Sequence, residues 1–311
     1  MTESISRLHR LAFAALLAFA AACAPCFAQN DVLLERAVTT ETKTGNRVET
    51  GFLTSGADAE DLDRGVFVWD YLAHTTYYYQ MNDRDNLRLR YQYWDFLNHN
   101  RRNFTSLRWR RQLSPTNAYW ILGDYTDEEK GSRNGNLCFG YQDLLKPDLQ
   151  WAAQLGAGYD HQHDVNTTLF LEVLKPLTVS TLLRASNDVC LASSGYRSET
   201  FRLHLIQALH KRLAMNLGYR FFGDHQISDD VDDVVSHEGS CALVFQALDN
   251  VFLTTRYGRY LNESHVQADS ISLGAIWRVT KRVSTTAGYR LQRFHGGPTD
   301  HGFRVGVSVD F

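Results

Sequence analysis

The side chains in this sequence with the most obvious chemistry are arginines that recur at every second position of short segments. A guanidinium keeps its charge at any ordinary pH and donates several hydrogen bonds, so a group of them around one space attracts anions. The arginines on the polar side of the alternation are Arg88, Arg90, Arg108, Arg110, Arg184, Arg202, Arg220, Arg256, Arg278, Arg290 and Arg304. The clearest acids on that side are Asp124, Glu172 and Asp310. The excess of base predicts a surface that prefers anionic solutes, although arginines paired with acids or backbone carbonyls would only make the structure rigid.

Two further groups carry side chains suited to metal binding. The first is an acidic cluster with the hard oxygen ligands that calcium prefers, formed by Asp229, Asp230, Asp232 and Asp233. The second is His161 and His163, whose imidazoles suit a transition metal or a response to pH. Both groups are equally compatible with solvated polar loops, so we predict neither a metal site nor a cofactor.

Two histidine–serine combinations are the candidates for a hydrolytic site, which needs a nucleophile and a base within hydrogen-bonding reach. They are His204 with Ser198, and His237 with Ser236 or Ser240. Neither has an evident acid to orient the histidine or an evident oxyanion donor. We therefore expect no enzyme, and a membrane-embedded lipid hydrolase is the alternative that these pairs leave open.

The segments that carry the arginines alternate between apolar and polar residues, which is typical of β-strands with one apolar face. The last segment has Phe303, Val305, Val307, Val309 and Phe311 on one side and Arg304, Gly306, Ser308 and Asp310 on the other. Residues 87–94, 213–222, 270–279 and 283–292 alternate in the same way. The pattern predicts an all-β fold whose strands are about ten residues long, the length that a tilted strand needs to cross a bilayer.

The N-terminal residues resemble a secretory signal peptide. Arg7 and Arg10 precede an apolar run at 11–22, and Cys26-Phe27-Ala28 follows it. The run is shorter than the ~20 residues of a spanning helix, so we expect cleavage after Ala28, with Cys23 as a lipoprotein acceptor the alternative. The predicted organisation is a signal peptide at 1–28, a short periplasmic segment at 29–42 and one β-barrel domain at 43–311.

Two features indicate that the apolar face of the strands meets lipid rather than a protein core. Aromatic residues gather at segment ends, as at 77–79 and 91–94, which is typical of the interfacial girdle of a membrane barrel. The chain also ends on Phe311 as the last residue of a strand, which resembles the C-terminal aromatic signal recognised during assembly of outer-membrane barrels. The sequence therefore predicts a transmembrane antiparallel up-and-down β-barrel in a bacterial outer membrane.

Turn-forming residues give the expected strand count. Short turns are predicted at 82–85, 114–117, 146–148, 175–176, 210–212, 249–250 and 280–282. Longer polar connections are predicted at 55–64, 127–134, 188–199, 224–237 and 262–268. With a first strand at 43–53, the count is about sixteen, in a range of about 14–18, and both termini are placed in the periplasm with the short turns.

Composition and cysteine content set limits on function. The formal net charge of -3 argues against a nucleic-acid-binding protein. After cleavage the cysteines are Cys138, Cys190 and Cys241, an odd number without the spacing of metal ligands. Two alternatives stay open: a disulfide from Cys138 to Cys241 or to Cys190, and three unpaired thiols.

The predicted architecture, with about sixteen strands and short loops, resembles the barrel portion of polysaccharide exporters and of YaiO-like outer-membrane proteins, and porins more broadly. The resemblance covers architecture only and assigns no residue. We expect no periplasmic helical-repeat domain of the kind that such exporters carry.

The predicted function is an outer-membrane channel that passes anionic or sugar-like solutes through an arginine-lined lumen, because a barrel of this size encloses more space than its side chains normally fill. The alternative is a structural or adhesive barrel filled by bulky inward side chains such as Trp94 and Phe170. Expected partners are outer-membrane lipids, lipopolysaccharide and the barrel assembly machinery, with a periplasmic export partner as a further option.

Overall fold

The computed structural model describes residues 46–57, 68–95, 101–128, 133–146, 148–160, 164–225, 234–262, 267–295 and 299–311. Three predictions lie outside these ranges: the signal peptide, the 29–42 segment, and the metal-binding candidates His161, His163, Asp229, Asp230, Asp232 and Asp233. Within the ranges, no helix has the length and apolarity needed to cross a membrane.

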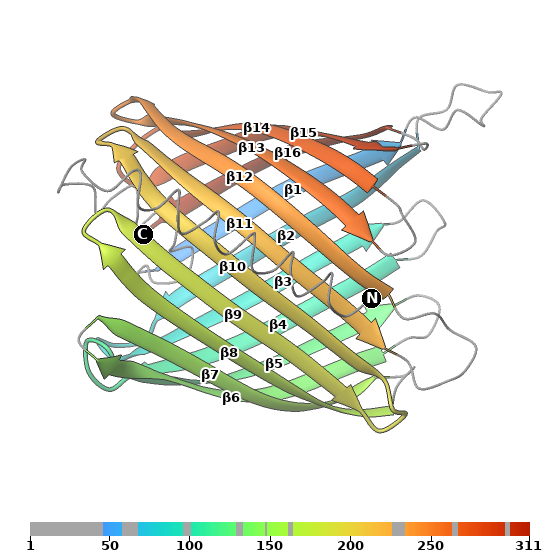
Figure 1. Cartoon of the computed structure of the whole chain (residues 1–311). Coiled ribbons are helices and arrows are strands. Elements are labelled where there is room, and N and C mark those ends of the chain that lie inside the picture. The colour runs from blue at the N-terminus through green and yellow to red at the C-terminus, as the bar shows by residue number, and fades with distance from the viewer. Residues whose placement is uncertain are drawn as a thin grey trace.

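Sixteen antiparallel strands close into a single barrel, as Figure 1 shows from the side. The strands are β1 (Arg47–Ala57), β2 (Val68–Gln80), β3 (Asp85–Asp95), β4 (Arg101–Gln112), β5 (Ala118–Glu128), β6 (Arg133–Lys146), β7 (Leu149–Asp160), β8 (Asp164–Thr178), β9 (Thr181–Ala192), β10 (Arg197–His210), β11 (Leu213–His225), β12 (Val234–Leu248), β13 (Val251–Asn262), β14 (Gln267–Arg278), β15 (Val283–Phe294) and β16 (Thr299–Asp310). Each strand pairs with its neighbours in sequence, and β1 pairs with β16. The predicted fold class and strand count are confirmed.

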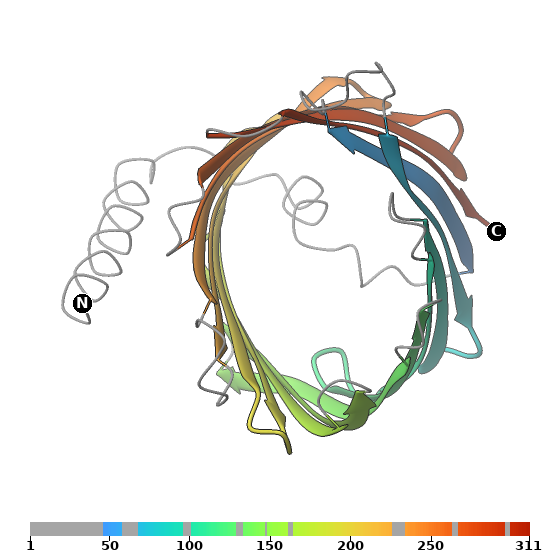
Figure 2. The ribbon, with the colours of Figure 1, turned by 90° about the vertical axis from the view of Figure 1, so that its right-hand side faces the viewer.

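The seam between β1 and β16 closes the ring, with pairing that runs from Arg47 opposite Asp310 to Ala57 opposite Asp300. In the view along the barrel in Figure 2, the blue and red ends of the chain meet at this seam. A closed ring leaves no strand edge unpaired, so every strand satisfies its backbone groups on both sides.

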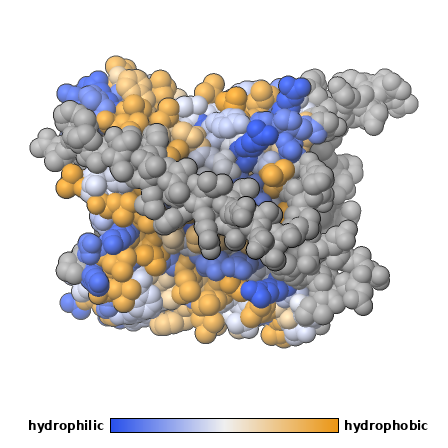
Figure 3. All heavy atoms as spheres, viewed as in Figure 1, coloured by the Kyte–Doolittle hydropathy of each residue, from blue (hydrophilic) through white to orange (hydrophobic). Residues whose placement is uncertain are grey.

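Cross-strand register divides the side chains into two faces all round the ring, because successive residues of a strand point to opposite sides. Leu89 on β3 lies opposite Leu107 on β4, and these apolar side chains are 43% and 47% exposed. Their neighbours Arg88 and Arg108, also opposite each other, point the other way, into the barrel. Figure 3 shows patches of apolar side chains, interspersed with polar ones, on the part of the outer face that it colours. An outer surface of exposed apolar residues on a closed barrel is the surface of a membrane-spanning protein.

Short connections gather at one end of the barrel and most of them lie where turn residues predict them. β12 ends at Leu248 and β13 begins at Val251, and β10 and β11 are separated by residues 211–212. The same end holds Arg47 at the start of β1 and Asp310 at the end of β16. We call this end the short-turn end, and we expect it to face the periplasm, where outer-membrane barrels have their short turns.

Three boundary predictions are wrong. β8 runs through 175–176 to Thr178, and the strand accommodates Pro176, which has no N–H to donate, at a shift in register between Pro176 and Thr178. The expected long connection at 188–199 is short, because β9 extends to Ala192 and β10 begins at Arg197. Gly195, at φ 87°, makes this tight turn feasible. The first strand is β1 at 47–57, four residues later than the predicted 43–53.

Candidate functional site

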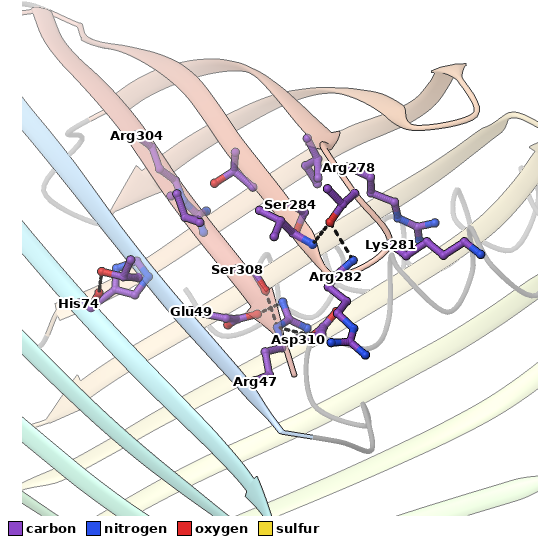
Figure 4. Close-up of a pocket in the computed structure, with 17 residues that line it drawn as sticks. Arg47, Glu49, His74, Arg278, Lys281, Arg282, Ser284, Arg304, Ser308 and Asp310 are labelled. Carbon is purple, nitrogen blue, oxygen red and sulfur yellow. Dashed lines mark hydrogen bonds and ion pairs between the residues drawn. The ribbon is translucent and has the colours of Figure 1, made fainter.

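An interior cavity of about 450 Å³ lies at the short-turn end, beside the seam that joins β1 to β16 (Figure 4). Its cationic lining consists of Arg47, Arg278, Lys281, Arg282 and Arg304, and His74 adds an imidazole. Its carboxylates are Glu49 and Asp310, and its hydroxyls are those of Thr280, Ser284, Thr286 and Ser308. We refer to this space as the basic mouth. Five cations therefore face two carboxylates, which gives the basic mouth a positive charge.

Both carboxylates of the basic mouth form ion pairs with the same arginine. Arg47 forms ion pairs with Glu49 and with Asp310, the latter at 3.7 Å between Nε and Oδ1. The same guanidinium donates to Ser308 Oγ at 2.6 Å. Figure 4 shows Arg47, Glu49, Ser308 and Asp310 grouped together at the end of the seam. Arg47 is thus a fixed, neutralised part of the wall.

The other cations of the basic mouth keep their charge. No carboxylate of the described residues lies within ion-pair distance of Arg278, Lys281, Arg282 or Arg304. Arg278 instead lies over the ring of Phe252, 5.5 Å from its centroid. The turn that carries Lys281 and Arg282 is held by Thr280, whose Oγ1 accepts from the Arg282 N–H at 3.1 Å. These side chains present hydrogen-bond donors and positive charge to any solute that enters.

Five of the predicted arginines form ion pairs across neighbouring strands. The pairs are Arg184 with Glu172 at 2.5 Å, Arg202 with Asp188, Arg220 and Arg256 with Glu238 at 3.9 and 2.8 Å, and Arg290 with Asp300 at 2.9 Å. The sequence alternation does not single out Glu238 or Asp300 as inward acids, and it predicts a loop at Asp188. For these five positions, the alternative of arginines that stiffen the wall has structural support.

A second, smaller cavity of about 220 Å³ lies among these ion pairs. Glu238, Arg256 and Arg290 line it together with the hydroxyls of Ser270, Ser272 and Tyr260 and the amide of Gln292. Both charged and neutral hydrogen-bonding groups line this cavity, which suits a solute rich in hydroxyl groups.

The remaining predicted arginines, apart from Arg278 and Arg304, form a cluster on β3 and β4. Arg88 lies opposite Arg108, and Arg90 and Arg110 follow on the same face. The Arg108 guanidinium lies 5.5 Å from the Trp120 ring, and the Trp120 indole N–H donates to Gln154 Oε1 at 2.8 Å. This second basic cluster also lies toward the short-turn end, because β3 begins at Asp85 and β4 ends at Gln112.

The histidine–serine pairs do not come together. Ser198 and His204 point to the same face of β10, but six residues separate them, or roughly 20 Å along the strand. His237 accepts or donates a hydrogen bond with Tyr219 Oη at 2.7 Å, while Ser236 and Ser240 point to the opposite face of β12. Cys138, Cys190 and Cys241, all within the described ranges, form no disulfide bond. No cluster of three or more potential metal ligands occurs in the part of the chain that the structure describes.

The chain matches no family model and no curated protein. Its fold is similar to that of a bacterial polysaccharide outer membrane secretin, with a TM-score of 0.61 and 11% identity over 86% of this chain and 100% of that chain. A loop-deletion mutant of OmpT, an outer membrane protein of Vibrio cholerae, gives 0.53 and 10% over 86% and 100%. An anion-selective porin from Comamonas acidovorans gives 0.51 and 13% over 86% and 98%. The protein therefore has the fold of a bacterial outer-membrane β-barrel.

Proposed function

We propose that this protein is an outer-membrane channel that conducts anionic, including sugar-like, solutes through the interior of the barrel. The observation that carries the proposal is the charge of the basic mouth, where Arg278, Lys281, Arg282 and Arg304 have no carboxylate partner among the described residues. A cluster of fixed cations within low-dielectric walls raises the local concentration of anions and lowers the barrier to their entry.

The wall beyond the basic mouth supports transport rather than permanent binding. Arg184, Arg202 and Arg290 are each paired with an acid, so an anion that has passed the basic mouth meets weaker attraction. Conduction requires binding that is strong enough for entry and weak enough for release. A basic mouth followed by nearly neutral, hydrogen-bonding walls meets both conditions.

The barrels that share this fold support a solute-conducting class, since one is described as an anion-selective porin and another as a polysaccharide secretin. Their identity to this chain is 13% and 11%, so the choice of solute rests on the residues of this protein alone.

Solute flux into vesicles tests the proposal. The full chain is reconstituted into liposomes, and swelling rates are compared for three solutes of similar size. These are anionic gluconate, neutral glucose and cationic, protonated glucosamine. We expect gluconate to enter fastest, and an Arg278→Gln/Arg304→Gln variant to lose most of that preference. An Arg133→Gln control removes an exposed arginine that pairs with Asp127 on the outer rim, and should behave like the parent. A folded barrel that admits none of the three solutes, or admits protonated glucosamine fastest, contradicts the proposal.

A further inference from the structure

The outer face of the barrel carries a second charged site, at the end opposite the short turns. Arg259 on β13 lies opposite Asp269 on β14, and Asp269 lies opposite Arg293 on β15. These side chains share the outward face with Tyr257 and Ile271, which are 45% and 48% exposed. The two arginine backbones are separated by two strand spacings, or about 10 Å. We call Arg259, Asp269, Arg293 and His295 the rim site.

The acid of the rim site is already occupied on both oxygens. Tyr257 Oη donates to Asp269 Oδ1 at 2.6 Å, and His295 Nε2 lies 2.7 Å from Asp269 Oδ2. His295 is held in place by its backbone N–H, which donates to the Gln267 carbonyl at 2.8 Å. Asp269 therefore positions the tyrosine and the histidine, and it attracts the Arg259 guanidinium only from beyond ion-pair distance.

The two arginines of the rim site outnumber its one carboxylate, so the site has an excess of positive charge. Arg259 donates to Gln267 Oε1 at 3.1 Å, a neutral acceptor. Neither Arg259 nor Arg293 has a carboxylate within ion-pair distance in the described ranges. Both side chains are exposed.

The other outward arginines at this end are different, because each has an acid beside it. Arg101 lies 3.9 Å from Asp95, Arg133 lies 3.1 Å from Asp127, and Arg197 lies 3.7 Å from Glu199. These pairs are close to neutral. Across the described outer face at this end, an excess of positive charge is found at the rim site.

We propose that the rim site binds the phosphate groups of a lipid headgroup in the outer leaflet. Arginine on the lipid-facing side of a barrel is tolerated near the membrane interface, which is where lipid phosphates lie. A guanidinium binds phosphate with paired, charge-assisted hydrogen bonds, and two of them about 10 Å apart can reach separate phosphates of one headgroup. Directly below, the exposed Ile271, Leu273 and Phe303 present an apolar surface for the acyl chains. This proposal does not depend on whether the barrel conducts solutes.

The test is lipid binding to the full chain in detergent, measured by native mass spectrometry. The probe is lipid A with both phosphates, and the comparison ligands are lipid A without phosphates and inorganic phosphate. We expect the intact lipid A to bind, and both comparison ligands to bind at least about 10-fold more weakly, because charge and apolar contact act together.

An Arg259→Gln/Arg293→Gln variant should lose about 10-fold or more in affinity for intact lipid A. A matched Arg133→Gln/Arg197→Gln variant removes two outward arginines that have acidic partners, and should retain the parental affinity. Heat-dependent migration in gels checks that each variant is folded. Equal binding of the phosphate-free lipid, or equal losses in the two double variants, overturns the proposal.

Discussion

Arg278 on β14 lies over the ring of Phe252 on β13, with 5.5 Å from the guanidinium carbon to the ring centroid. Phe252 is 2% exposed and packs with Ala214, Val244 and Ile276. An aromatic face attracts a cation but does not neutralise it. The contact therefore positions Arg278 at the basic mouth and leaves its charge available to an anion.

The first prediction concerns the packing of Phe252, the ring that positions Arg278. Phe252→Ala should lower the free energy of unfolding by about 3 kcal/mol, because a buried aromatic ring is replaced by a cavity. Urea unfolding of the protein in lipid vesicles, followed by tryptophan fluorescence, measures the change. Phe303→Ala is the control, since Phe303 faces outward and is 50% exposed, so lipid fills the space that its ring leaves. A loss at Phe252 no larger than the loss at Phe303 would show that the Phe252 cluster does not stabilise the barrel.

A second prediction follows from the acid that two arginines share. Glu238 pairs with Arg220 and Arg256, so Glu238→Gln removes a negative charge from the interior and leaves both guanidinium groups in place. The preference for anions, measured as solute flux into vesicles, should therefore increase. Asp249→Asn is a matched control, because Asp249 is a turn residue whose side chain is 94% exposed and whose partner is Arg212 in the neighbouring turn. A decrease in anion preference on Glu238→Gln would contradict the account of the interior charges.

Thiol chemistry provides a third prediction, on access to the interior. Cys190 on β9 lies opposite Thr168 and Ser198 on the interior face, whereas Cys241 on β12 points outward beside Leu217 and Tyr257. In reconstituted protein, charged methanethiosulfonate reagents should modify Cys190 and spare Cys241. The anionic reagent should react faster than the cationic one, because the interior concentrates anions. Reaction of Cys190 only after unfolding would instead favour the filled, structural barrel.

A fourth prediction uses the position of the basic mouth at one end. A polyanion such as inositol hexakisphosphate should block conductance at lower concentration from the short-turn side than from the opposite side. The Arg278→Gln/Arg304→Gln variant should reduce this difference, while Arg133→Gln should leave it unchanged. Equal block from both sides of the parent protein would show that the basic mouth does not set the entry barrier.

The strand architecture was predictable because each strand has one face toward lipid and one toward the interior. This environment forces a period of two along the sequence, and β16 from Thr299 to Asp310 carries it in its plainest form. Strand boundaries were less predictable where a turn-forming residue lies inside a strand of the closed barrel. Pro176 is a turn-forming residue by type, yet β8 continues past it because a shift in register accommodates the proline.

The contacts of the interior arginines could not be predicted from the sequence. Glu238 lies between Arg220 and Arg256 only because β11, β12 and β13 pair in one particular register, which no local pattern specifies. The contribution of Lys281 and Arg282 was missed for a related reason. Both belong to a turn, and only the closed ring brings that turn into the same cavity as Arg304 and Arg47.

The anion selectivity of the proposed channel is measured by the reversal potential of the refolded full chain in a planar bilayer under a gradient of potassium chloride. We expect steady conductance with a reversal potential of the sign set by chloride, shifted toward zero in the Arg278→Gln/Arg304→Gln variant. A folded barrel that does not conduct, or one whose reversal potential has the sign set by potassium, would contradict the proposed function.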